Sequence, residues 1–133
     1  MKAPLTVLVA CGSWHIGARV IQRLSEVKGV DIMGHVTDAG EALGLIESMK
    51  PKLVILDAHL SHGTGIGVLR AVKESVAGTI VIMLSASSYP QYRKECLKEG
   101  ADFYFHLPDE MEELKNSVRD LARAGTARSI VQE

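Results

Sequence analysis

Five short apolar runs recur along the chain, and each is followed by a stretch whose apolar residues have helical spacing. A strand-then-helix unit repeated in this way implies a parallel sheet that is covered by helices on both faces. The sequence therefore predicts an α/β domain with a doubly wound, five-stranded parallel sheet and five helices. The predicted strands are residues 6–10, 30–36, 53–56, 79–84 and 102–107.

The predicted helices are bounded by residues that suit helix ends. Asp38 can cap a helix that runs to Met49 and places Met49 in its inner stripe. Pro90 suits a first helical turn, and Gly100 suits a helix end. We expect the five helices at residues 14–27, 38–49, 66–76, 90–99 and 109–123.

Length and composition indicate one ordinary globular domain. The chain has 133 residues, 47% apolar and 23% charged. We expect the domain at residues 1–123 and a C-terminal tail or linker stump at 124–133, where no strong pattern remains. A net charge of -1 favours neither nucleic acid nor an anionic membrane as a partner. With two cysteines and no signal peptide or membrane span, we predict a reduced, cytoplasmic setting.

The carboxyl ends of the predicted strands are the expected functional crevice. In an open α/β sheet, ligands bind outside these ends, near the point where the strand order reverses. The residues placed there are Ala10, Cys11, Asp57, Ser85, His106 and Leu107. Asp57 therefore lies where function is expected.

Three segments carry a resemblance to response-regulator receiver domains of two-component signalling, which extends over about residues 5–123. The resemblance implies a flavodoxin-like fold with strand order 2-1-3-4-5. The segments are LVILDAHLSHGTG at 53–65, VIMLSA at 81–86 and GADFYFHLP at 100–108.

The resemblance also implies roles for four residues. In the family, an aspartate at the end of strand three accepts a phosphoryl group, and Asp57 matches it. Ser85 matches a switch hydroxyl, Tyr104 an aromatic that reports phosphorylation, and Pro108 a proline that often follows a cis bond. We expect a cis Leu107–Pro108 bond. From the residues alone, Ser85 can equally cap local backbone groups, and Tyr104 can be core.

Three other positions depart from the family pattern. Ala10 and Cys11 replace its acidic pair, and Leu107 replaces its lysine. Mg²⁺ takes hard oxygen ligands that usually include one or two carboxylates, and the motif leaves Asp57 alone in the crevice. Loss of one preorganised charge contact typically lowers a rate on the order of 10²–10³-fold. We therefore predict a degenerate, non-enzymatic receiver with no cofactor, or with weak Mg²⁺ binding at Asp57.

Two alternatives stay open. In the first, Asp57 still accepts a phosphoryl group from a histidine kinase. In the second, the chain senses a metal or an oxidant, either through a Cys11 thiol whose pKa is lowered by a helix N-terminus or through a zinc site. The residues considered for zinc are Cys11, Asp57, His59, His62 and His106.

Protein partners are expected on the face formed by the fourth helix, the fifth strand and the fifth helix. Arg93, Lys94 and Lys98 lie on the predicted fourth helix, in the surface that the resembling family uses for dimers and output partners. The partners would be a histidine kinase, a phosphotransfer protein, an output protein or a second copy. A solvated face of mixed charge is the alternative.

Overall fold

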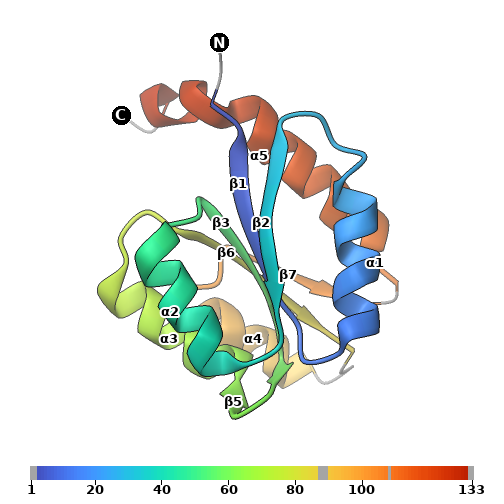
Figure 1. Cartoon of the computed structure of the whole chain (residues 1–133), viewed down its shortest axis with the longest axis vertical. Coiled ribbons are helices and arrows are strands. Elements are labelled where there is room, and N and C mark those ends of the chain that lie inside the picture. Colours follow the sequence, from blue (N-terminus) through green and yellow to red (C-terminus); the bar gives the residue numbers. More distant parts are fainter. Residues whose placement is uncertain (1–2, 87–89, 108, 132–133) are drawn as a thin grey trace.

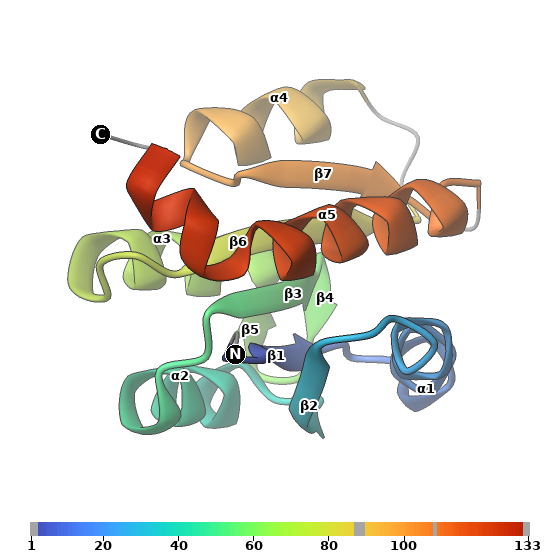
Figure 2. The same cartoon turned by 90° about the horizontal axis from the view of Figure 1, so that it is seen from above.

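A five-stranded parallel sheet forms the centre of the computed structural model, which describes residues 3–86, 90–107 and 109–131. Every neighbouring pair of strands is parallel, so the predicted fold and strand order are confirmed (Figure 1). β2 lies at one edge, as predicted, and β7 at the other (Figure 2). Across the sheet, the order is β2 (Val30–Val36), β1 (Leu5–Ala10), β3 (Leu53–Asp57), β6 (Ile80–Ser85) and β7 (Phe103–His106).

Helices cover both faces of this sheet. One face packs against α1 and α5, and the other packs against α2, α3 and α4 (Figure 1). None of the helices in the described part of the chain is long and apolar enough to cross a membrane. The helices are α1 (Trp14–Leu24), α2 (Ala39–Met49), α3 (Gly65–Ser75), α4 (Pro90–Lys98) and α5 (Met111–Val131).

The central strand divides the core into two apolar clusters. All five residues of β3 are buried, and their side chains alternate between the two faces. Val54 and Leu56 pack toward α2 and α3, whereas Leu53 and Ile55 pack toward α1 and α5. Packing on both faces of the sheet therefore fixes the end of β3, where Asp57 follows Leu56.

Several details differ from the sequence prediction. Met49 was expected in the inner stripe of α2, but it is the last residue of the helix and is 43% exposed. A small hairpin, β4 (His59–Leu60) with β5 (Gly63–Thr64), follows β3 and was not predicted. α5 continues past Arg123 to Val131. The role of residues 124–133 as a tail or linker stays a prediction, and the predicted cis bond involves Pro108, which lies outside the described residues.

Candidate functional site

Asp57 is the last residue of β3 and is held by its backbone neighbours. Ala58 donates a hydrogen bond to the Leu84 carbonyl (3.0 Å), and Gly65 donates one to the Ala58 carbonyl (3.0 Å). A Cβ on Gly65 would collide with the Asp57 carbonyl oxygen. The glycine therefore allows α3 to start directly against the end of β3.

A second glycine approaches the same segment from the other side. Gly12 follows β1 and donates a hydrogen bond to the His59 carbonyl (2.9 Å). A Cβ on Gly12 would collide with this carbonyl oxygen. We call the packing of Gly12 and Gly65 against residues 57–59 the glycine clamp, and it fixes the backbone that carries the Asp57 carboxylate.

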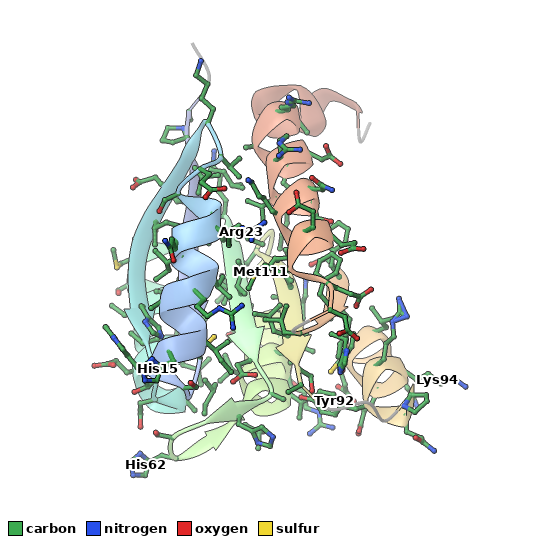
Figure 3. All side chains as sticks on the ribbon, turned by 90° about the vertical axis from the view of Figure 1, so that its right-hand side faces the viewer. His15, Arg23, His62, Tyr92, Lys94 and Met111 are labelled. Atoms are coloured by element: carbon green, nitrogen blue, oxygen red, sulfur yellow. The ribbon has the colours of Figure 1, made fainter. Side chains whose placement is uncertain are left out.

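A cavity of about 400 Å³ opens above Asp57. Its walls come from α1, β3, β4, β6, α5 and the segments beside them, and Figure 3 shows one wall residue, Met111, between α1 and α5. Most of the surface is apolar, and Asp57 is the one carboxylate among the lining residues. The cavity is lined by Gly12, Ser13, Ile16, Arg19, Asp57, His59, Leu84, Ser85, Ala86, Leu107 and Met111.

The environment of Asp57 disfavours its charged form. Its side chain is almost buried, and this burial raises the pKa of the carboxyl group above its usual value. The backbone N–H groups of Ala58, His59 and Gly12 and the nearby His59 act in the opposite direction, but burial has the larger effect. Within the described ranges, no lysine or arginine forms an ion pair with Asp57.

The three positions that depart from the family pattern are buried around the site. Ala10 and Cys11 have no exposed surface, and Leu107 is 7% exposed. Burial and then the negative charge of Asp57 raise the pKa of the Cys11 thiol to about 12. The lowered pKa that the redox alternative needs is therefore not found at Cys11, because its thiol is buried in the core.

The zinc alternative is wrong for the residues described. No group of three His, Cys, Asp or Glu side chains that could hold a metal ion occurs among them. His62 pairs with Asp38 (Nδ1 to Oδ1, 2.6 Å) on the exposed hairpin (Figure 3). His106 faces the Asp109 carboxylate (Nδ1 to Oδ2, 3.1 Å). The histidines are thus directed to separate partners.

The same donor set does not fit a magnesium site. Mg²⁺ needs oxygen ligands in near-octahedral geometry. Among the lining residues, side-chain oxygens come from Ser13, Asp57 and Ser85, and of these Asp57 alone has a carboxylate. The buried side chains of Ala10 and Cys11 provide no oxygen. We therefore assign no metal-dependent reaction to this site.

Ser85 and Tyr104 lie in different surroundings. Ser85, at the end of β6, is buried and lines the cavity with Asp57. Tyr104 is 8% exposed and packs under α4, where Tyr92 makes an edge contact (6.1 Å between ring centroids) and the Arg93 guanidinium lies 6.0 Å from its ring centre. The structure thus brings Asp57, Ser85 and Leu107 together and places Tyr104 outside their cavity.

Sequence reasoning missed the part of the cavity wall that α1 and α5 provide. Ile16, Arg19 and Met111 line the cavity, and none of them was predicted as a site residue. A helical pattern shows which residues face inward, but the meeting of α1 and α5 above Asp57 depends on tertiary packing. Trp14 precedes this wall and stacks on His35, with ring centroids 4.3 Å apart.

Comparison with known proteins connects this site to one family. A family model for the response regulator receiver domain matches residues 15–119. The DNA-binding transcriptional activator EvgA of Escherichia coli is 28% identical over 94 residues, which cover 71% of this chain and 46% of EvgA. The chain spans about half the length of the curated relatives that it matches.

Solved structures give the same result. The signal receiver domain of the response regulator NarL from Mycobacterium tuberculosis is 26% identical, with a TM-score of 0.83, and the match covers 91% of this chain and 98% of that one. The signal receiver domain of a Luxo repressor protein from Vibrio parahaemolyticus is 25% identical, with a TM-score of 0.85 and 98% of both chains covered.

Proposed function

The chain belongs to the response regulator receiver domain family of two-component signalling, and we propose that it acts there as a degenerate receiver. In this role, it binds protein partners, has no enzymatic activity of its own and accepts a phosphoryl group at Asp57 weakly or not at all. The observation that carries the proposal is the apolar cavity over Asp57.

The chemistry of phosphoryl transfer supports this proposal. A transferred phosphoryl group carries negative charge on several oxygens, and cations must neutralise this charge. At this site, Leu107 provides an apolar wall where the family has an ammonium group, and Ala10 and Cys11 provide no ligand for a metal ion. A phosphoryl group on Asp57 would therefore place uncompensated charge against apolar surface.

The proposed partner surface is formed by α4, β7 and α5. Arg93, Lys94 and Lys98 are exposed on α4, where Lys94 points outward (Figure 3), and Leu97 is 40% exposed among them. Arg70 of α3 pairs with Glu95 of α4 and with Glu99, the residue after this helix, so ion pairs link the two helices. Glu95 is exposed on the same helix, so this surface has mixed charge around an apolar residue. Such a surface suits a protein partner, and a second copy is an alternative partner.

The partner class is proposed as protein and the location as cytoplasmic. EvgA is described as DNA-binding, and that property is stated of EvgA. The net charge of -1 gives this chain no overall attraction to nucleic acid. We expect a histidine kinase, a phosphotransfer protein or an output protein to bind the α4–β7–α5 surface.

Beryllofluoride, a phosphoryl mimic, tests the proposal. Trp14 is next to Ser13, which lines the cavity, so its fluorescence can report occupation of the site. We expect no response of the parent protein to beryllofluoride with Mg²⁺. The variant with Ala10→Asp, Cys11→Asp and Leu107→Lys is the positive control, and it should respond.

The two outcomes are distinguishable. A response of the parent that Asp57→Asn abolishes would contradict the proposal and favour the phosphoacceptor alternative, in which Asp57 and Ser85 share one working cavity. Silence of the parent beside a response of the triple variant supports a degenerate receiver. Circular dichroism of each variant verifies that the fold is retained.

A further inference from the structure

The cavity over Asp57 has the dimensions of a small-molecule site. Ligand pockets in proteins are typically clefts of about 300–1,000 Å³ with mostly apolar walls and a few polar groups that orient the ligand. This cavity measures about 400 Å³, and its apolar walls include Ile16, Leu84, Leu107 and Met111. These side chains come from α1, β6, the end of β7 and α5, so four separate parts of the fold surround the space above Asp57.

The Asp57 carboxylate in this cavity forms no ion pair with a described residue. Asp57 is only 9% exposed. An ionised carboxylate that is removed from water is unfavourable unless it is paired and hydrogen-bonded. Arg19 and His59 also line the cavity, but both are exposed, so water screens their charges.

We propose that the cavity binds a small, mostly apolar molecule that carries one ammonium group, with the ammonium against Asp57 and the apolar part against Ile16, Leu107 and Met111. This inference rests on the proposed function, because a site that worked with Mg²⁺ and phosphate would be occupied by those ions. Binding would then regulate the domain in place of phosphorylation.

The same residues disfavour other ligand charges. An anionic ligand would lie against the Asp57 carboxylate, and Leu107, the wall position that matches the family's lysine, has no charge to attract it. A bare divalent cation lacks a group of three ligand side chains among the residues described. An ammonium group is compact, donates three hydrogen bonds and needs one carboxylate partner.

Calorimetry with simple amines tests the inference on the intact chain. The probes are 2-phenylethylamine, cyclohexylmethylamine and butylamine, and 2-phenylethanol is the neutral counterpart of the first. A hydrogen-bonded charge pair contributes enough that 2-phenylethylamine should bind about tenfold or more tightly than 2-phenylethanol. Asp57→Asn should remove that difference, because the neutral amide cannot pair with an ammonium.

Two further variants sharpen the test. Leu107→Lys places an ammonium group of the protein itself beside the cavity and should abolish amine binding. Asp31→Asn is the matched control, because Asp31 is an exposed carboxylate at the opposite end of the sheet, where β2 begins, and its loss should leave binding unchanged.

The inference is overturned if none of the three amines binds, or if amine binding survives Asp57→Asn in a protein that circular dichroism shows to be folded. Equal affinity for 2-phenylethylamine and 2-phenylethanol would overturn it as well. Failure of the proposed function is seen separately, as a response of the parent protein to beryllofluoride with Mg²⁺ in the absence of any amine.

Discussion

A buried carboxylate without a cation beside it affects stability as well as function. Burial raises the pKa of Asp57 in the folded chain above its value in the unfolded chain, so the folded chain binds this proton more tightly. The resulting stabilisation is complete below the unfolded pKa and is lost as the pH rises through the folded pKa. At pH 7, Asp57 therefore contributes less to stability than it does in acid.

Asp57→Asn should raise the free energy of unfolding at pH 7, by about 1 kcal/mol, the common scale of single substitutions. The advantage of the variant should shrink as the pH falls below the folded pKa of Asp57, because the parent carboxyl group is then neutral too. Urea unfolding of both proteins from pH 4 to pH 8 measures this. A destabilised variant at pH 7 would show that the groups that favour the carboxylate, such as the backbone N–H groups of Ala58 and Gly12, outweigh the cost of its burial.

Gly65 and Gly44 make opposite predictions for the same substitution. Gly65→Ala forces a Cβ into the Asp57 carbonyl oxygen, which is backbone and cannot turn away, so we expect destabilisation of about 1–3 kcal/mol. Gly44 lies within α2 with nothing within 4 Å of its Cβ position, and Gly44→Ala should stabilise by about 0.5–1 kcal/mol. Thermal unfolding of both variants tests this, and equal effects would contradict the glycine clamp.

At the residue scale, the sequence placed Asp57 correctly because a run of four apolar residues leads directly into it. The surroundings of Asp57 were less predictable. Leu107 was expected beside it from the strand ends, but Met111 and Ile16 reach the same cavity through the packing of two helices that no spacing rule specifies. The raised pKa of Cys11 follows from that enclosure and was not predicted either.

At the scale of elements, α3 depends on one side chain at its start. The Thr64 hydroxyl accepts a hydrogen bond from the Gly67 N–H (3.1 Å) and caps the helix. Thr64→Ala should destabilise the protein by about 1 kcal/mol, whereas Thr64→Ser keeps the oxygen and should change stability less. Chemical denaturation compares the two, and equal losses would show that the methyl group, not the cap, matters.

Helix α4 is held against β7 by an aromatic contact. Tyr104 is buried under Tyr92 and Arg93, so Tyr104→Ala should cost about 3–5 kcal/mol and loosen α4. Tyr104→Phe keeps the ring and should change little. Amide hydrogen exchange of residues 90–98 gives the local readout. If α4 stays protected in a folded Tyr104→Ala variant, other contacts hold the helix.

The elements themselves were largely predictable, and the exceptions have physical reasons. Strand 30–36 and the start of α2 at the Asp38 cap matched the sequence because periodicity and capping act locally. The hairpin of β4 and β5 has two residues in each strand, too few for any alternation to appear. Met49 follows the helical spacing of α2 and yet is exposed at the end of the helix, because spacing gives the direction of a side chain and not whether another element covers it.

At the scale of the whole molecule, the sheet separates two cores, and each contains one cysteine. Cys11 packs with α1 and α5, and Cys96 packs with α2, α3 and α4. Both thiols have no exposed surface and raised pKa values, so neither should react with a thiol reagent while the domain is folded.

The two cysteines therefore report whether the domain opens as one unit. We expect Cys11 and Cys96 to be labelled at the same rate at each urea concentration, as measured with Cys11→Ala and Cys96→Ala variants that each keep one thiol. Faster labelling of Cys96 would mean that α4 opens separately, and the two layers would then be independent units of stability.

The prediction of the overall topology had two sources, the pattern of residues and the resemblance to a known family. The alternation of strands and helices indicated a parallel sheet from the residues alone, whereas the order of the strands came from the resemblance to receiver domains. The structure has that order, β2-β1-β3-β6-β7. Local pattern does not specify which strands become neighbours, because several right-handed arrangements satisfy the same pattern.

The glycine clamp has a consequence for protein engineering. Because Gly12 and Gly65 hold the main chain at residues 57–59 through backbone contacts, the attachment point of side chain 57 does not depend on which side chain it carries. The backbone at position 57 is thus rigid, and its side chain points into a mostly apolar cavity. A designer who needs a general base or a thiol in such a cavity can replace the aspartate and expect the frame around it to stay in place.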